Sequence, residues 1–203
     1  TASYQATPAG FAARGLTESQ SRSLIEHSVA LAQEAREIYQ AENASAGPLL
    51  VAGSVGPYGA YLADGSEYRG DYVRSAEEFQ AFHRPRIEAL LNAGADLLAC
   101  ETLPSFAEIE ALADLLLDYP QAQAWFSFTL RDENHLSDGT PLTRVVDTLA
   151  NCSQIVALGI NCIALEKTTA ALTHLHSLTA LPLVVYPNSG ETYDATTKEW
   201  HAH

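Results

Sequence analysis

Residues 155–162 read Ile-Val-Ala-Leu-Gly-Ile-Asn-Cys, a continuous apolar run that ends in two polar residues. A run of this length that does not alternate with polar residues is typical of a strand buried on both faces of a parallel sheet. Asn161 and Cys162 would then stand at the carboxyl end of that strand. In α/β folds with parallel sheets, this is the end where binding and catalytic groups gather.

The same pattern recurs along the chain. Apolar runs of strand length lie at residues 49–52, 96–100, 124–129 and 183–186, and helical patterns fill the intervals. Strict alternation of strand and helix predicts a parallel sheet with right-handed crossovers, either a doubly wound sheet or a (β/α)8 barrel. The chain holds neither a Gly-x-Gly-x-x-Gly turn nor a phosphate-binding loop motif, which removes the best evidence for a nucleotide fold.

Start signals mark the predicted helices. Thr17, Ser75 and Ser105 each precede a Glu or Gln by three residues, which fits a capping box. Thr140-Pro141 fits a cap followed by proline at the first helical position. The helix after Thr17 carries an apolar stripe at a spacing close to 3.6 residues, and we expect this stripe to pack against the sheet. We expect the polar stretch Gly56–Tyr72 to form a loop over the mouth of the sheet.

Polar residues follow most of the predicted strands, as in an active site at the mouth of a barrel. These clusters are Gly53–Pro57, Glu101-Thr102, Asn161-Cys162 and Pro187–Gly190. A closed barrel needs eight strands, whereas the chain shows five, with residues 1–4 as the tail of another, and it begins with Thr rather than Met. We therefore predict one (β/α)8 TIM barrel domain over residues 1–203, truncated at both ends, with the first and eighth strands missing.

Composition limits the partners of the protein. The 203 residues hold 11 Lys and Arg against 25 Asp and Glu, for a formal charge of −14. Such a chain repels nucleic acid and anionic membranes, and no apolar run approaches the roughly 20 residues that span a bilayer. Three cysteines are too few for a disulfide framework. We predict a cytoplasmic protein with reduced thiols and with neither a nucleic-acid nor a membrane partner.

Two residues at strand ends carry the strongest chemical interpretation. The Cys162 thiol could serve as a nucleophile or a metal ligand, or could be a small buried side chain. No other Cys or His stands at a metal-ligand spacing from it. Glu101 could pair with a substrate ammonium group or act as a base, or could be solvated near the start of the next helix. Asn188 could hydrogen-bond a ligand, although Pro-Asn-Ser-Gly is also an ordinary turn sequence.

Four segments together resemble the homocysteine S-methyltransferase family, and most closely its bacterial members that use S-methylmethionine. They are Val-Ala-Gly-Ser-Val-Gly-Pro-Tyr-Gly-Ala-Tyr at 51–61, Cys-Glu-Thr-Leu-Pro at 100–104, Gly-Ile-Asn-Cys at 159–162 and Val-Tyr-Pro-Asn-Ser-Gly-Glu at 185–191. The likeness runs in the same order over essentially all 203 residues. It implies a (β/α)8 barrel with zinc held by three cysteine thiolates. Cys162 matches one of them, and the Gly-Gly-Cys-Cys motif that supplies the other two does not occur in the chain.

The resemblance also implies an activity. Zinc-dependent methyl transfer from a sulfonium donor, S-methylmethionine or possibly S-adenosylmethionine, to the homocysteine thiolate would give methionine. Glu101 would pair with the amino group of homocysteine, and we place Asn161 and Asn188 in the same substrate site. We expect the 203 residues by themselves to be inactive. The alternatives are another barrel enzyme that uses Glu101 as a base, or a non-catalytic amino-acid-binding barrel.

Overall fold

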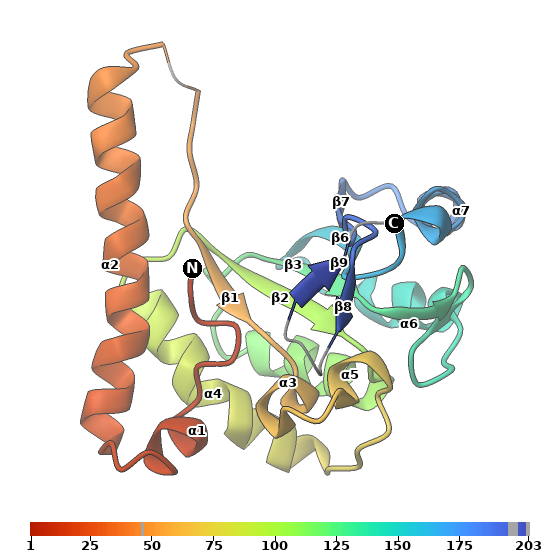
Figure 1. The fold of residues 1–203 in the computed structure, drawn as a ribbon, viewed down its shortest axis with the longest axis horizontal. Helices are drawn as coiled ribbons and strands as arrows, with labels where there is room; N and C mark the ends of the chain where they lie inside the picture. Colours follow the sequence, from red (N-terminus) through yellow and green to blue (C-terminus); the bar gives the residue numbers. More distant parts are fainter. Residues whose placement is uncertain (46, 195–198, 202–203) are drawn as a thin grey trace.

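A parallel sheet of five strands forms the centre of the protein, seen here in a computed structural model that describes residues 1–45, 47–194 and 199–201 (Figure 1). The strands are β1 (Ala52–Val55), β2 (Leu97–Leu103), β3 (Ala124–Phe128), β6 (Ile155–Asn161) and β7 (Leu183–Tyr186). Their order in the sheet is β1-β2-β3-β6-β7, and each pairs in parallel with the next. The order follows the chain without reversal, which is the order of a (β/α) barrel, because a doubly wound sheet reverses at a switch point.

Two helices precede β1, and the others lie in the crossovers between the strands of the sheet. They are α1 (Pro8–Ala12), α2 (Glu18–Glu42), α3 (Tyr58–Leu62), α4 (Ala76–Asn92), α5 (Phe106–Leu116), α6 (Leu142–Leu149) and α7 (Leu165–Leu178), with a 3-10 turn η1 (Ser66–Tyr68). Two small antiparallel hairpins join β4 (Leu130–Asp132) to β5 (His135–Leu136) and β8 (Thr192–Asp194) to β9 (Glu199–His201). Within the described residues, none of the helices combines the length and the apolar character needed to cross a membrane.

The hydrophobic core lies between the sheet and helices α4 to α7. Strand residues such as Leu98, Phe126 and Leu158 are almost fully buried, and Leu90 of α4 and Leu112 of α5 cover them from the helical layer. Burying a side chain of this size contributes about 1.5–3 kcal/mol. The apolar runs that form β2, β3 and β6 are therefore covered on both faces as predicted, whereas Val185 of β7 is 43% exposed.

The first two strands are displaced from their predicted positions. The apolar run at 49–52 predicts a strand there, but β1 begins at Ala52, and Leu50 is 68% exposed. Pairing decides the position, because Ala52 lies opposite Leu97 in β2 and the carboxylate of Asp96 accepts a hydrogen bond from the Val51 amide at 2.7 Å. Strand β2 in turn continues beyond its apolar run to Leu103.

Residues 1–4 do not form the predicted strand. They nevertheless lie beside β1, because the amino group of Thr1 donates to the carbonyl of Ala52 at 2.9 Å and the Ser54 amide donates to the Thr1 hydroxyl at 2.9 Å. The Thr1 nitrogen and hydroxyl thus each meet one backbone group of β1. The prediction of a strand tail was wrong, because residues 1–4 form no ladder with β1 and turn away after Ser3.

Two of the four predicted helix caps form in the structure, and two do not. Both capping boxes at Thr17 and Ser75 are confirmed, with reciprocal bonds to the residue three positions on. The box predicted at Ser105 was wrong, because Glu108 turns into the protein interior and Ser105 makes no side-chain cap. The cap predicted at Thr140 was also wrong, since Pro141 itself takes the N-cap position of α6.

Helix α2 does not pack its apolar stripe against the sheet. It stands at one side of the molecule, next to α4 (Figure 1), and buries Ile25 and Val29 while Leu31 and Ile38 are 52% and 55% exposed. A polar contact attaches the second half of α2 to the residue before β2, since Arg36 forms an ion pair of 2.6 Å with Asp96. The apolar stripe predicted the helix correctly but its partner wrongly: within the described residues α2 makes its main helical contact with α4.

Candidate active site

The carboxyl ends of β2, β6 and β7 bring together the polar residues that follow them. The Cys162 amide donates to the carbonyl of Tyr186 at 3.1 Å, and the Asn161 side chain donates to the Thr102 hydroxyl at 2.7 Å. Parallel strands end at one edge of a sheet, so residues far apart in sequence meet there. We call this group of strand-end residues, with the segment 56–72 beside it, the mouth.

Glu101 is held from both sides of the mouth. One carboxylate oxygen accepts a hydrogen bond from the Ser54 hydroxyl of β1, and the other accepts from the Tyr186 hydroxyl of β7 at 2.8 Å. The Tyr186 hydroxyl also meets that of Ser127 in β3 at 2.8 Å. Strands β2 and β7 are not neighbours, so this contact requires a strongly curved sheet, as in a barrel. The Glu101 carboxylate is thereby fixed in place and half-buried.

Cys162 lies directly after β6 and is half-buried. Its thiol accepts a hydrogen bond from the Asn161 side-chain amide at 3.3 Å. Burial raises the pKa of the Cys162 thiol, and the negative charges of Glu101 and Glu67 raise it further, against the lowering effect of the hydrogen bonds from Asn161 and Thr102. The free thiol is therefore protonated at neutral pH, and only a cation or metal beside it would favour the thiolate.

The backbone at the mouth adopts unusual conformations. Cys162 has φ 51° and Thr102 has φ 65°, both in the left-handed region that non-glycine residues rarely occupy. Such positions cost on the order of 1–3 kcal/mol each and cluster at functional sites. Two of them side by side, joined through Asn161, indicate that the fold holds the Cys162 thiol in a specific direction.

Asn161 and Asn188 differ in their surroundings. The Asn161 side chain is buried; it accepts from the Thr102 amide at 3.0 Å and donates to the Thr102 hydroxyl and the Cys162 sulfur. These contacts orient protein groups, and a direct contact of Asn161 with substrate stays a prediction. Asn188 is exposed in the turn after β7, where its amide donates to the Ile163 carbonyl at 2.9 Å. Its predicted role in substrate binding likewise stays a prediction.

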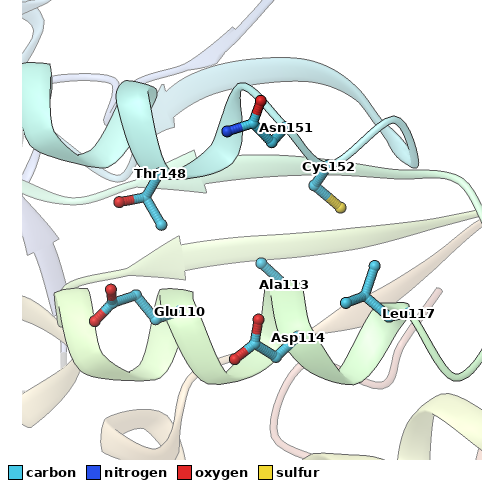
Figure 2. A pocket seen from close by; sticks show the side chains of 7 residues that line it. All are labelled: Glu110, Ala113, Asp114, Leu117, Thr148, Asn151 and Cys152. Atoms are coloured by element: carbon cyan, nitrogen blue, oxygen red, sulfur yellow. The ribbon is translucent and has the colours of Figure 1, made fainter.

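The other two cysteines lie elsewhere. Cys100 is fully buried in the core, and burial raises the pKa of its thiol to about 12, so it behaves as an apolar residue. Cys152 follows α6 and lines a groove of about 210 Å³ between α5 and α6 (Figure 2). In the part of the chain that the structure describes, no three His, Cys, Asp or Glu side chains are grouped to hold a metal ion. Cys162 therefore stands as a single potential ligand.

The segment 56–72 is not the loop that its composition predicts. It contains α3 and η1, folded tightly upon each other. Gly59 allows this close approach, since a Cβ atom there would lie 2.5 Å from the backbone nitrogen of Glu67. The prediction of a loop was wrong in structure, but the segment does lie beside the mouth, because the Thr129 hydroxyl, just beyond β3, donates to the Glu67 carbonyl at 3.1 Å.

A buried polar network that the sequence analysis missed supports this segment. The Glu108 carboxylate accepts from the Tyr58 amide at 2.6 Å, from His83 Nε2 at 2.7 Å and from the Tyr72 hydroxyl. Arg86 donates to His83 Nδ1 at 3.0 Å, which places the histidine proton on Nε2. Arg86 also donates to the carbonyls of Gly56 at 2.6 Å and Tyr4 at 2.8 Å.

The charges of this network follow from its burial. Burial lowers the pKa of His83, and it lowers the pKa of Arg86 to about 10, so His83 is neutral and Arg86 charged at neutral pH. A signal for the network exists in the sequence, because Glu108 lies one turn before Leu112 on the apolar stripe of α5. A charged residue on such a stripe is almost never fully buried unless it is paired.

Comparison with known proteins decides the family. The family profile described as "Homocysteine S-methyltransferase" matches residues 1–203, the whole chain. The chain belongs to the homocysteine S-methyltransferase family. This match confirms the family resemblance that the four strand-end segments indicated. The mouth is therefore part of a chain of this family.

Individual relatives agree with this assignment. The chain is 77% identical to "Homocysteine S-methyltransferase" of Escherichia coli strain K12 over 203 residues, and 52% identical to "Homocysteine S-methyltransferase YbgG" of Bacillus subtilis strain 168 over 204 residues. These alignments cover 100% and 99% of this chain but 66% and 65% of the relatives, so the chain spans just under two thirds of their length.

A solved structure extends the comparison to the fold. The structure titled "Homocysteine Methyltransferase MmuM from Escherichia coli, Metallated form" superposes with a TM-score of 0.93 at 78% identity. The superposition covers 94% of this chain and 66% of that one. The predicted fold class is confirmed, and the protein titled as metallated shares the fold of this chain over the superposed residues.

Proposed function

We propose that the protein to which these residues belong transfers a methyl group from a sulfonium donor to homocysteine, with zinc, and forms methionine. The observation that carries this proposal is the mouth itself. In a chain of this family, it combines a thiol at the end of β6 with a fixed carboxylate at the end of β2. S-methylmethionine is the donor we favour on the resemblance, and S-adenosylmethionine is the second candidate.

The donor set supports zinc in part. Cys162 is a half-buried thiol with a defined direction, and thiolate sulfur is a preferred zinc ligand. A catalytic zinc needs about three protein ligands, and we propose that two adjacent cysteines outside the 203 residues supply the others. When bound, zinc lowers the pKa of a coordinated thiol, so that homocysteine is held as a thiolate at neutral pH.

Glu101 is proposed to bind the amino group of homocysteine. Hydrogen bonds from Ser54 and Tyr186 engage both of its oxygens and hold the carboxylate in one orientation. A carboxylate fixed in this way suits an ion pair with an ammonium group better than proton abstraction. This geometry favours substrate anchoring over the alternative in which Glu101 acts as a base.

The chemical step exchanges one carbon–sulfur bond for another. The homocysteine sulfur forms a bond to the methyl carbon while the bond from that carbon to the donor sulfur breaks. The electron pair of the broken bond stays on the donor sulfur, which leaves as a neutral thioether. With S-methylmethionine as donor, both products are methionine. The reaction needs in-line positioning and a dry site, and the α3–η1 segment beside the mouth is suited to provide both.

The net charge and the free thiols of the chain support the proposal that it acts on small molecules in the cytoplasm. A formal charge of −14 disfavours nucleic acid and anionic membranes as partners. All three cysteines are free in the structure, as a reducing compartment would keep them. Homocysteine and a sulfonium donor are therefore the partners that we propose.

The test compares two cysteine substitutions in the complete, zinc-loaded protein. We expect Cys162→Ser to lose both bound zinc and methionine formation from homocysteine and S-methylmethionine, because a metal ligand is removed. Cys152→Ser is the matched control, since Cys152 lines the groove between α5 and α6 (Figure 2) and should leave both unchanged. Zinc is measured by atomic emission. Full zinc and activity in Cys162→Ser would overturn the proposal.

A further inference from the structure

A second carboxylate, that of Glu67 in η1, belongs to the mouth and lacks a partner. Its Oε2 atom is buried and has no hydrogen-bond partner among the residues that the structure describes. Burying a charged oxygen without a partner is unfavourable. Such an atom is therefore expected to gain a cationic or hydrogen-bonding partner when a ligand binds.

The backbone of Glu67 is fixed against the end of the sheet. Its carbonyl accepts a hydrogen bond from the Thr129 hydroxyl at 3.1 Å, and its nitrogen packs against Gly59 of α3. The adjacent cation, Arg69, is turned to other acids, since it pairs with Asp71 at 2.8 Å and approaches Asp64 at 3.8 Å. The backbone that carries the orphan oxygen is thus held in place, and among the described residues Arg69 forms its ion pairs with Asp64 and Asp71 and not with Glu67.

The turn η1 that carries Glu67 contacts β2, the strand that carries Glu101 and Thr102, so the Glu67 carboxylate lies beside the mouth. Its negative charge raises the pKa of the Cys162 thiol, and also that of the Tyr4 and Tyr68 hydroxyls, in addition to the larger effect of burial. Glu101 acts on the same thiol. The two carboxylates differ in that both oxygens of Glu101 are hydrogen-bonded, while Glu67 keeps one free.

We propose that Glu67 binds the positively charged sulfonium group of the methyl donor and selects it over a neutral thioether. This inference rests on the proposed function. The two substrates bring two ammonium groups and one sulfonium group to one mouth, and Glu101 is already assigned to the ammonium of homocysteine. The unpartnered oxygen of Glu67 belongs to the same mouth as Cys162, the proposed ligand of the zinc that would hold the accepting sulfur, and it suits the cation that must lie in line with that sulfur.

The charge change during the reaction predicts a kinetic signature. The sulfonium charge disappears as the methyl group leaves, so a carboxylate stabilises the bound donor at least as well as the transition state. Interactions of this kind lower KM without raising kcat. Glu67 is therefore a specificity residue whose loss should appear in the donor KM and not in kcat.

The experiment uses the complete, zinc-loaded protein and the variant Glu67→Gln. We expect the KM for S-methylmethionine to rise about tenfold to a hundredfold, as for loss of a charged contact, with kcat and the homocysteine KM little changed. Calorimetry adds a readout without turnover: the wild type should bind S-methylmethionine more tightly than homoleucine, its uncharged carbon isostere, and Glu67→Gln should lose that preference. Glu37→Gln, an exposed change of equal charge on α2, should match the wild type.

The outcomes separate this inference from the proposed function. An unchanged donor KM and an unchanged preference over homoleucine in Glu67→Gln would overturn the role of Glu67, as would a rise confined to the homocysteine KM. A wild type that forms no methionine would instead overturn the proposed function, and the calorimetric preference would still test Glu67. If Glu67→Gln bound neither ligand, Glu67→Asp would decide, because restoring the charge should restore the preference.

Discussion

The carboxylates of this protein are placed in two contrasting environments. Glu108 is fully buried, and both of its oxygens accept hydrogen bonds, with the charge of Arg86 nearby and His83 between them. The mouth instead gathers Glu67 and Glu101 around a thiol, next to two residues with left-handed backbone. In the first environment both carboxylate oxygens are satisfied and a cation lies nearby, although Arg86 Nε has no partner, whereas the second is anionic and leaves a carboxylate oxygen without a partner. This difference separates a group that holds the fold from groups placed for ligands.

The two environments are physically connected. Arg86 donates to the carbonyls of Tyr4 and Gly56, and Glu108 accepts from the Tyr58 amide, so the network fixes the start of the segment that carries Glu67. The network around Glu108 therefore positions the segment that carries Glu67. Changing the first should cost stability, and changing the second should cost binding.

The largest effect is expected from Arg86→Met. This change removes the buried cation near Glu108 and leaves the carbonyls of Gly56 and Tyr4 without their donor, and disrupting a buried network in this way costs about 3–5 kcal/mol in free energy of unfolding. Urea unfolding of the complete protein measures it. Arg84→Met is the matched control: Arg84 pairs with Asp118 on the surface, and such pairs contribute about 0–1 kcal/mol. Equal losses in the two variants would show that the network does not stabilise the fold.

A smaller effect, on binding alone, is expected from Glu101→Gln. The amide keeps the shape of the side chain but loses the charge proposed to pair with homocysteine, so the homocysteine KM should rise about tenfold to a hundredfold. Bound zinc and the donor KM should stay near their wild-type values, opposite to Glu67→Gln. Steady-state kinetics at varied concentrations of each substrate distinguish the two carboxylates. An unchanged homocysteine KM would remove Glu101 from the substrate site.

The smallest effect is a pH dependence of stability that arises from His83. Burial lowers the pKa of His83 below its ordinary value of 6.5, so below that pH the unfolded chain binds a proton that the folded chain does not. The free energy of unfolding should therefore fall as the pH is lowered from about 7 to about 5.5. The urea midpoint measures this fall. His83→Gln should reduce it, while His176→Gln, on the exposed face of α7, should not.

Much of the fold can be predicted from local patterns. Strand β7 spans the residues that its apolar run predicts, and β3 and β6 differ from theirs by one residue. The capping boxes at Thr17 and Ser75 form as their sequences predict. These signals act within a few residues, so tertiary contacts change them little. The start of β1 and the partner of α2 could not be predicted, because pairing with β2 and packing on α4 decided them.

By itself, the sequence determined the alternation of strands and helices, and the positions of Glu101 and Cys162 at strand ends. The tertiary structure alone decided which carboxylates are satisfied. Tyr186 reaches Glu101 across 85 residues of chain, whereas Glu108 finds His83 and Arg86 on another helix. Glu67, Glu101 and Glu108 have the same side chain and differ only in the donors around them. Those donors come from segments that only the crossovers of the parallel sheet bring together, which is why no local pattern in the sequence predicts them.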